Sequence, residues 1–193
     1  MLTSITPLGE RGRGNRWRTT SAWLVFGHVV GGFALGLLLA GVGALFVLVG
    51  VDPSPAVSTA VVSVAVLGGA VFDLCGGRMP GRRQVDERWL TKYRGWVYGL
   101  GFGAQLGFGF VTVVNTALFV SVCVAGVLLP VTNALLLGVV YGSTRGLVAA
   151  SNGRIRSTAA LHRMHRRLDR YEKPVRWGAA VTVTALALGS IVA

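Results

Sequence analysis

The chain has 193 residues, of which 52% are hydrophobic and only 13% are charged. A soluble domain has about 25% charged residues, so the composition excludes an ordinary soluble enzyme, a disordered tail and a collagen. The charge is one-sided, with 19 Lys and Arg against 7 Asp and Glu, and the net charge is +12. In a membrane protein such an excess is first tested as a topology signal.

Five stretches are apolar and long enough, or nearly so, to cross a bilayer, since a spanning helix takes roughly 20 residues. In chain order they are residues 22–51, 55–75, 96–127, 131–150 and 177–193. The only charged residues within them are Asp73 and Arg145. We therefore predict an all-α integral membrane protein with about five transmembrane helices.

The basic residues alternate with the spans. The expected parts are a basic N-terminal segment (1–21), a first transmembrane hairpin (22–75), a basic loop (76–94), a second hairpin (95–150), a basic amphipathic helix (151–176) and a last transmembrane helix (177–193). Every Lys and Arg lies in the three basic parts except Arg145, which lies near the same end of its span. The positive-inside rule then predicts a multi-pass protein of the cell membrane with a cytoplasmic N-terminus and an outside C-terminus.

This distribution also identifies the expected partner of the bases. Because topology accounts for the net charge, it argues against nucleic acid. Anionic lipid headgroups at the cytoplasmic surface are the expected partner instead.

The two hairpins show a weak internal repeat. Aligning Trp23 with Trp96 also aligns Gly36 with Gly109, and residues 44–47 with the identical run 117–120. Each hairpin starts on the cytoplasmic side, so the pattern predicts two parallel hairpin repeats related by an axis along the membrane normal, plus a C-terminal helix.

The first and third spans are unusually long. At about 30 residues each would measure ~45 Å, whereas a bilayer core is about 30 Å thick, so each must tilt, kink or break. Both are rich in glycine, and the pairs Gly32/Gly36 and Gly103/Gly107 have the GxxxG spacing. This spacing predicts close helix approach.

Polar side chains inside a span are costly in lipid and are functional candidates. The densest group lies in the third span and contains Gln105, Thr112, Asn115 and Thr116. On a continuous helix Gln105, Thr112 and Thr116 would share one face, with Asn115 beside them. Such a face could bind a small ion or polar solute, with His28 of the first span coupling protons. The alternative is that these groups only hydrogen-bond neighbouring helices.

Asp73 and Arg145 form the candidate gate or latch. In the repeat register they occupy equivalent cytoplasmic ends of the two hairpins. We expect a salt bridge between them, as a structural latch or a gate. Alternatively, Arg145 snorkels to the headgroups.

The segment 154–176 has the pattern of a basic amphipathic helix. Its apolar residues recur at steps of three and four and are Leu161, Met164, Leu168, Tyr171 and Val175. Between them lie the candidate contact residues Arg163, Arg166, Arg167 and Arg170. The helix is expected either in the cytoplasmic headgroup layer or against a cytoplasmic subunit. No third ligand accompanies His162 and His165, so neither a metal nor another cofactor is expected.

Three glycine- and aromatic-rich stretches carry a resemblance. They read YRGWVYG (93–99), GAQLGFGFVT (103–112) and GVVYGSTRGL (138–147). They resemble actinobacterial membrane proteins grouped with the cytochrome c biogenesis and thiol–disulfide transmembrane electron carriers. That family has a Cys in the break of each of two long helices and inverted repeats. Here Asn115 and Thr116 stand about where such a Cys would fall, so the resemblance implies a scaffold of broken helices around a polar midplane site without redox cysteines.

Two functions are compatible with these features. The first is a small polytopic membrane transporter or carrier-like protein, acting as a homo-oligomer or in a larger membrane complex. The second is a non-catalytic accessory subunit that docks a cytoplasmic or membrane partner. The sequence has no HExxH, GxSxG or Walker A motif, which argues against an enzyme.

Overall fold

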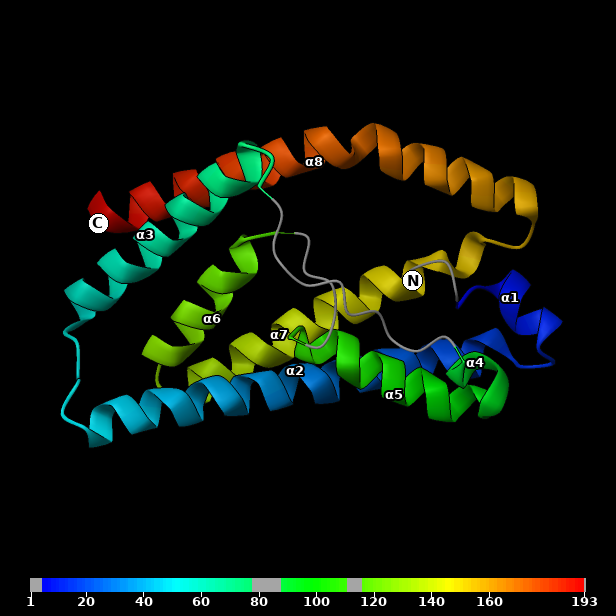
Figure 1. Cartoon of the computed structure of the whole chain (residues 1–193), viewed down its shortest axis with the longest axis horizontal. Helices are drawn as coiled ribbons and strands as arrows, with labels where there is room; N and C mark the ends of the chain where they lie inside the picture. Colours follow the sequence, from blue (N-terminus) through cyan, green and yellow to red (C-terminus); the bar gives the residue numbers. More distant parts are fainter. Residues whose placement is uncertain (1–4, 78–87, 111–115, 193) are drawn as a thin grey trace. The chain divides into compact units, whose positions relative to one another are not determined.

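The computed structural model describes residues 5–77, 88–110 and 116–192. Within these residues the chain is all-helical, which confirms the predicted all-α class. The elements are α1 (Pro7–Gly12), α2 (Trp17–Leu48), α3 (Pro55–Leu74), α4 (Trp89–Lys92), α5 (Gly95–Phe108), α6 (Leu118–Leu128), α7 (Val131–Ala150), the short 3₁₀ helix η1 (Ser151–Arg154) and α8 (Thr158–Val192) (Figure 1).

Three of these helices are long and apolar enough to cross a membrane. They are α2, α3 and the combined segment Val131–Arg154 of α7 and η1. These helices correspond to the first, second and fourth predicted spans. The third predicted span is divided between α5 and α6, and the last one is the second part of α8. The count of five spans therefore stays a prediction.

Helix starts follow the local sequence. Ser54 precedes α3, accepts a hydrogen bond from the Val57 N–H and is followed by Pro55 at the first helical position. Thr6 caps α1 in the same way, accepting from the Gly9 N–H at 3.1 Å. Both are Ser/Thr-Pro starts, which satisfy a free N–H and pre-set the first helical φ.

The chain divides into two compact units. The first contains Met1–Leu35, Arg82–Val113 and Gly138–Asp169, and the second contains Gly36–Gly81, Val114–Leu137 and Arg170–Ala193. The helices α2, α7 and α8 each contribute one part to each unit.

In the first unit, α2 packs against α5 and α7 at backbone distance. A Cβ added at Gly103 would lie 2.2 Å from the Leu24 carbonyl oxygen, and one at Gly107 would lie 2.3 Å from that of His28. Glycine is therefore required where these helices cross, as the GxxxG spacing predicts. A small core of this unit contains Ile5, Leu24, Leu90, Tyr98, Phe102 and Ala149.

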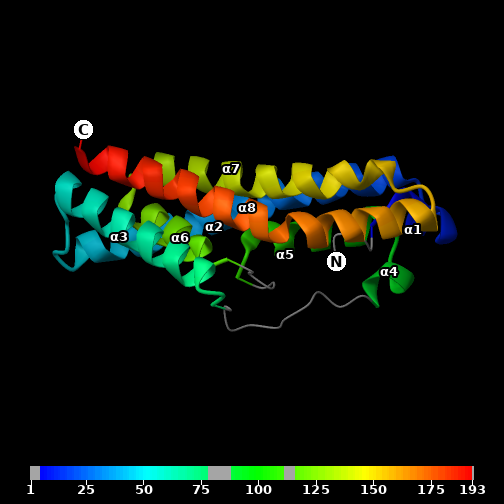
Figure 2. The same cartoon turned by 90° about the horizontal axis from the view of Figure 1, so that it is seen from above.

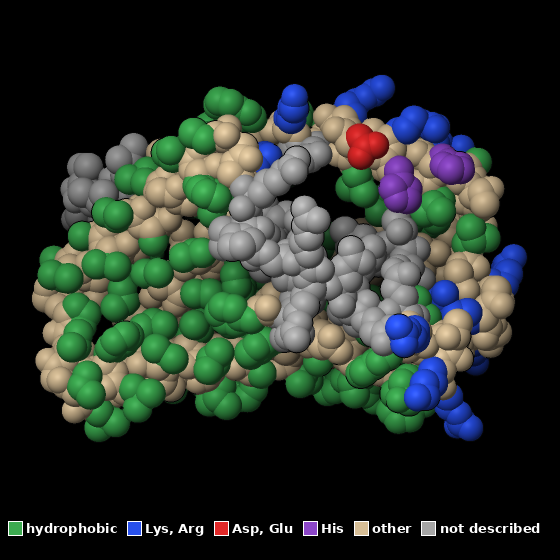
Figure 3. Space-filling model, in the orientation of Figure 1, with side chains coloured by type: hydrophobic (Ala, Val, Ile, Leu, Met, Phe, Trp, Pro, Cys, Tyr) green, Lys and Arg blue, Asp and Glu red, His purple; other side chains and the backbone are tan. Residues whose placement is uncertain are grey.

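In the second unit, α3 packs against α6, and Figure 2 shows these two helices side by side. The second part of α2 contacts α6 closely, since a Cβ at Gly43 would lie 2.3 Å from the Val127 carbonyl oxygen. Large apolar side chains of α2 and α3 remain exposed, such as Leu48 at 79% and Val64 at 69%. Hydrophobic side chains also cover the face over α3 and α6 in Figure 3. A bilayer would cover such a surface.

The helix α5 ends in a tight turn at Gly109. This glycine has φ 82° and ψ −50°, and the Phe110 N–H donates to the Phe108 carbonyl oxygen at 3.1 Å. These dihedral angles and the i to i+2 hydrogen bond define a γ-turn of the rare form that glycine accommodates best. Gln105 and Thr116 therefore do not lie on one continuous helix, because α5 ends before Thr116, and a break is one of the outcomes that the length of the third span leaves open.

The helix α8 also differs from expectation. The sequence predicts an amphipathic helix over 151–176 and a separate span over 177–193, whereas one helix covers Thr158–Val192, after η1. Pro174 lies inside it and cannot donate a backbone hydrogen bond, which weakens the helix locally and permits a bend. The predicted boundary between the amphipathic helix and the last span therefore lies inside α8, close to Pro174.

Candidate functional site

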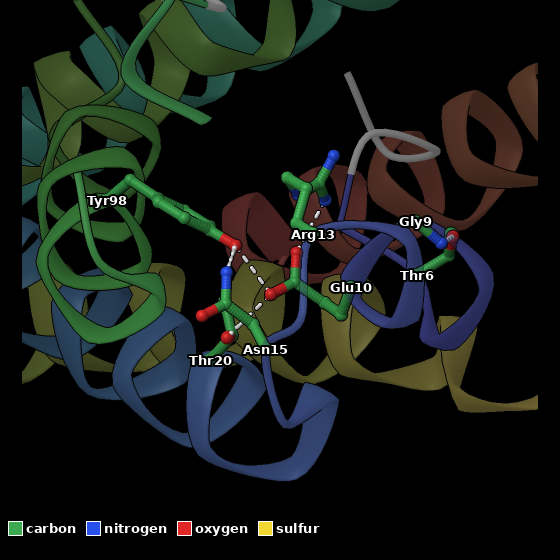
Figure 4. A network of polar contacts seen from close by, with 7 residues as sticks. All are labelled: Thr6, Gly9, Glu10, Arg13, Asn15, Thr20 and Tyr98. Carbon is green, nitrogen blue, oxygen red and sulfur yellow. Dashed lines mark hydrogen bonds and ion pairs between the residues drawn. The ribbon is translucent and has the colours of Figure 1, made fainter. Parts of the chain in front are cut away.

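The most elaborate polar cluster surrounds Glu10 in the first unit. Its side chain is fully buried (0% exposed). Arg13 Nη2 donates to Oε1 at 2.5 Å, while Thr20 Oγ1 and Tyr98 Oη donate to Oε2 at 2.8 Å and 2.5 Å. In Figure 4 these three groups converge on the carboxylate from different parts of the chain. A buried carboxylate is tolerated only with such partners.

The cluster extends beyond the carboxylate. Asn15 Nδ2 donates to Tyr98 Oη at 3.1 Å, and the Arg13 guanidinium carbon lies 5.9 Å from the centre of the Tyr98 ring. Burial alone would lower the pKa of Arg13, but the hydrogen bond and charge of Glu10 outweigh it and raise that pKa above its ordinary value. The Arg13 guanidinium therefore stays charged beside Glu10 at physiological pH.

This arrangement suits a clamp. The donors on Glu10 come from the end of α1 (Arg13), from α2 (Thr20) and from α5 (Tyr98), so the carboxylate fixes α1 against two other helices. The backbone adds to this, because the Leu8 N–H donates to the Ile155 carbonyl oxygen at 3.3 Å. Glu10 is absent from the sequence-based candidates. The sequence offers one signal for its role: Glu10 is the single acidic residue of the basic segment 1–21, and it precedes Arg13 by three positions.

A second buried carboxylate belongs to Asp73 in the second unit. It is 3% exposed, accepts a hydrogen bond from the Thr116 hydroxyl and accepts another from the Ala117 N–H at 2.8 Å. The Leu118 N–H in turn donates to Thr116 Oγ1 at 3.2 Å. Asp73 thus lies at the start of α6, where free N–H groups and the helix dipole favour negative charge.

The predicted third-span group is not assembled on one helix. Gln105 is half-buried in α5 of the first unit, whereas Thr116 precedes α6 in the second unit. Thr112 and Asn115 lie outside the described residues. Of this group, Thr116 is the member joined to a buried charge, because it hydrogen-bonds Asp73.

His28 lies where α2 crosses α5 and α7. It is 2% exposed, and its Nδ1 lies 2.8 Å from the Leu24 carbonyl oxygen. Since a carbonyl only accepts, Nδ1 is the donor of this hydrogen bond. Cβ atoms at Gly107 and Gly142 would each collide with the His28 backbone, so His28 is part of the tightly packed crossing.

The predicted latch partners have other contacts. Arg145 Nη1 donates to Tyr141 Oη at 2.6 Å, and its guanidinium carbon lies 5.5 Å from the centre of that ring. Asp73 and Arg145 belong to different units, and their ion pair stays a prediction. The arginines at 163, 166, 167 and 170 are exposed on α8.

No protein-family model, no curated protein and no solved structure matches this chain. The resemblance to the thiol–disulfide electron carriers therefore stays a prediction, as does its implication of a polar midplane site.

Proposed function

We propose that this chain is a small polytopic membrane transporter or carrier-like protein that binds a small cation at Asp73. The observation that supports this proposal is a buried carboxylate at the start of α6, in an apolar segment that α5 and α6 divide between them. Transporters characteristically place substrate and ion sites at discontinuous helices. Charges inside a membrane segment are costly and mark ion pathways by default.

The proposed architecture has five spans, with the N-terminus in the cytoplasm and the C-terminus outside. The second of two parallel hairpins contains the segment that α5 and α6 divide between them, and a last helix completes each subunit. A chain of 193 residues would enclose a pathway as a homo-oligomer or within a larger membrane complex.

The contacts of Asp73 suggest how binding could be coupled to movement. Its two oxygens already accept from Thr116 and Ala117. A cation that binds the carboxylate competes with these donors and weakens the attachment of α6 to α3. A bound cation would thereby shift α6 from the state attached to α3 toward a released state, because the cation binds these two states with different affinities.

Replacing Asp73 with asparagine tests this proposal. We expect currents evoked by sodium, potassium or proton concentration jumps on proteoliposomes to fall at least about tenfold, because asparagine lacks the negative charge that binds the cation, and a tenfold change corresponds to about 1.4 kcal/mol of lost binding. Asparagine still accepts from the Ala117 N–H, so the protein stays folded. The matched control is Asp52→Asn in the exposed connection before α3, which retains wild-type currents. Equal currents in the two variants, or no current from the wild-type protein with any of these ions, would refute the proposal.

The second candidate function is a non-catalytic accessory subunit. The close backbone contacts of α2 with α5 and α7, together with the Glu10 clamp, favour a rigid scaffold. The mass of the particle extracted in native nanodiscs separates the two functions. A carrier is expected alone or as a homo-oligomer. A subunit is expected with a stoichiometric second protein that is lost when Arg163, Arg166 and Arg167 are replaced by glutamate.

A further inference from the structure

The first part of α8 carries an apolar stripe that is largely exposed in the described chain. Leu168, Tyr171 and Val175 lie along one face of the helix and are exposed at 46%, 55% and 65%. Leu161 and Met164 continue the same face and are half-buried. Exposed apolar side chains in a continuous stripe mark a contact surface.

Basic side chains occupy the rest of this segment. At 100° per residue, Arg163, Arg166 and Arg170 lie on the side opposite the stripe, and Arg167 lies at its border. All four are exposed. Figure 3 shows Lys and Arg side chains gathered over the first part of α8. Residues 158–176 contain six Lys and Arg against two acids, so the occupant of this surface should be negatively charged.

We propose that residues 158–176 bind the anionic headgroup layer of the cytoplasmic leaflet, with Leu168 and Tyr171 inserted between lipids. An apolar stripe bordered by arginines is the pattern of a helix that lies in a membrane interface. The same helix continues into an uncharged stretch, 177–192, which would hold the basic part within reach of headgroups. Pro174 permits the bend that this arrangement needs.

This surface does not depend on the proposed transport. It requires that the apolar helices reside in a membrane with the basic segments on the cytoplasmic side, and it is compatible with a carrier or an accessory subunit. An acidic cytoplasmic protein is the competing occupant. Lipid is favoured because the stripe continues along the helix to Val175 and adjoins the uncharged stretch 177–192. A membrane that holds this uncharged stretch would therefore already lie next to the stripe.

The experiment uses the full chain, with Cys75 and Cys123 replaced by alanine and one new cysteine for an environment-sensitive dye. Leu168→Cys reports the stripe, and His162→Cys reports an exposed position on another face. The protein is placed in nanodiscs of phosphatidylcholine, alone or mixed with phosphatidylglycerol, that contain nitroxide-labelled lipids. We expect quenching at position 168 but not at position 162, and stronger quenching with phosphatidylglycerol.

Replacing Arg163, Arg166 and Arg167 by glutamine should lower the ratio of bound to unbound helix on the order of 100-fold, because each base near an anionic surface contributes about 1 kcal/mol. High salt should act in the same direction. Equal quenching at positions 162 and 168 would overturn the proposal. So would quenching at position 168 that is indifferent to phosphatidylglycerol, or protection of the dye only after cytosolic protein is added.

Discussion

Replacing Gly32 with alanine is expected to prevent stable folding, whereas the same change at Gly41 is expected to leave the protein folded and as stable or slightly more so. Both glycines lie in α2, where alanine is the better helix former by up to ~1 kcal/mol. A Cβ at Gly32, however, would lie 2.2 Å from the Gly138 carbonyl oxygen and 2.9 Å from the Gly142 Cα. At Gly41 no atom lies within 4 Å.

The size of this effect follows from what the methyl group meets. Overpacking in a core typically costs ~1–3 kcal/mol when side chains can shift. Here the obstacles are backbone atoms of α7, so the two helices must separate along the whole crossing, and we expect a loss above that range. Thermal unfolding in nanodiscs, followed by circular dichroism, measures the difference. Similar melting temperatures for the two variants would show that α2 and α7 do not pack at this distance.

Removal of the Glu10 carboxylate is expected to be nearly as damaging. In Glu10→Ala, the donors Arg13, Thr20 and Tyr98 lose their shared acceptor. Breaking a buried ion pair costs ~3–5 kcal/mol, and the partial exposure of Arg13 reduces the expected loss to about 2–4 kcal/mol. Because Glu10 connects α1 to the other helices, the loss should appear as release of α1.

Trypsin measures this release, since Arg11 and Arg13 lie in and directly after α1. We expect faster cleavage at both arginines in Glu10→Ala, with a lower melting temperature. Wild-type cleavage rates in this variant would contradict the clamp.

A pair of tyrosine variants supplies the matched control. Tyr98→Phe keeps the buried ring but removes one donor to Glu10 and the acceptor of Asn15, so a loss of ~1–2 kcal/mol is expected. Tyr93→Phe alters a tyrosine that is 42% exposed and should change stability by less than ~0.5 kcal/mol.

The elements best predicted from the sequence are those that local pattern determines. The bounds of α3 and α7 follow from predominantly apolar runs that start at Pro55 and directly after Pro130. The close approach of α2 and α5 follows from glycine spacing, because only small residues permit it. The stripe on α8 follows from the helical period, because residues three and four positions apart share one face of a helix regardless of its neighbours.

What could not be predicted depends on distant contacts. Gly36 and Gly109 are aligned in the predicted repeat, yet Gly36 continues α2 while Gly109 ends α5. Gly36 packs against the Ala134 carbonyl oxygen, and no local pattern distinguishes the two positions. Glu10 likewise gains its role from Tyr98, 88 residues away. From the local sequence alone, an acidic residue among arginines predicts a solvent-exposed charge.

The long separation between Glu10 and Tyr98 has a consequence for biosynthesis. A ribosome adds about 5–20 residues per second, so α1 waits roughly 4–18 seconds for α5 to emerge. Throughout this interval Glu10 cannot pair with Tyr98, so α1 lacks one of its contacts while α2 is being made. Docking of α1 against α5 is therefore a late step of folding, which can occur only after Tyr98 has been made.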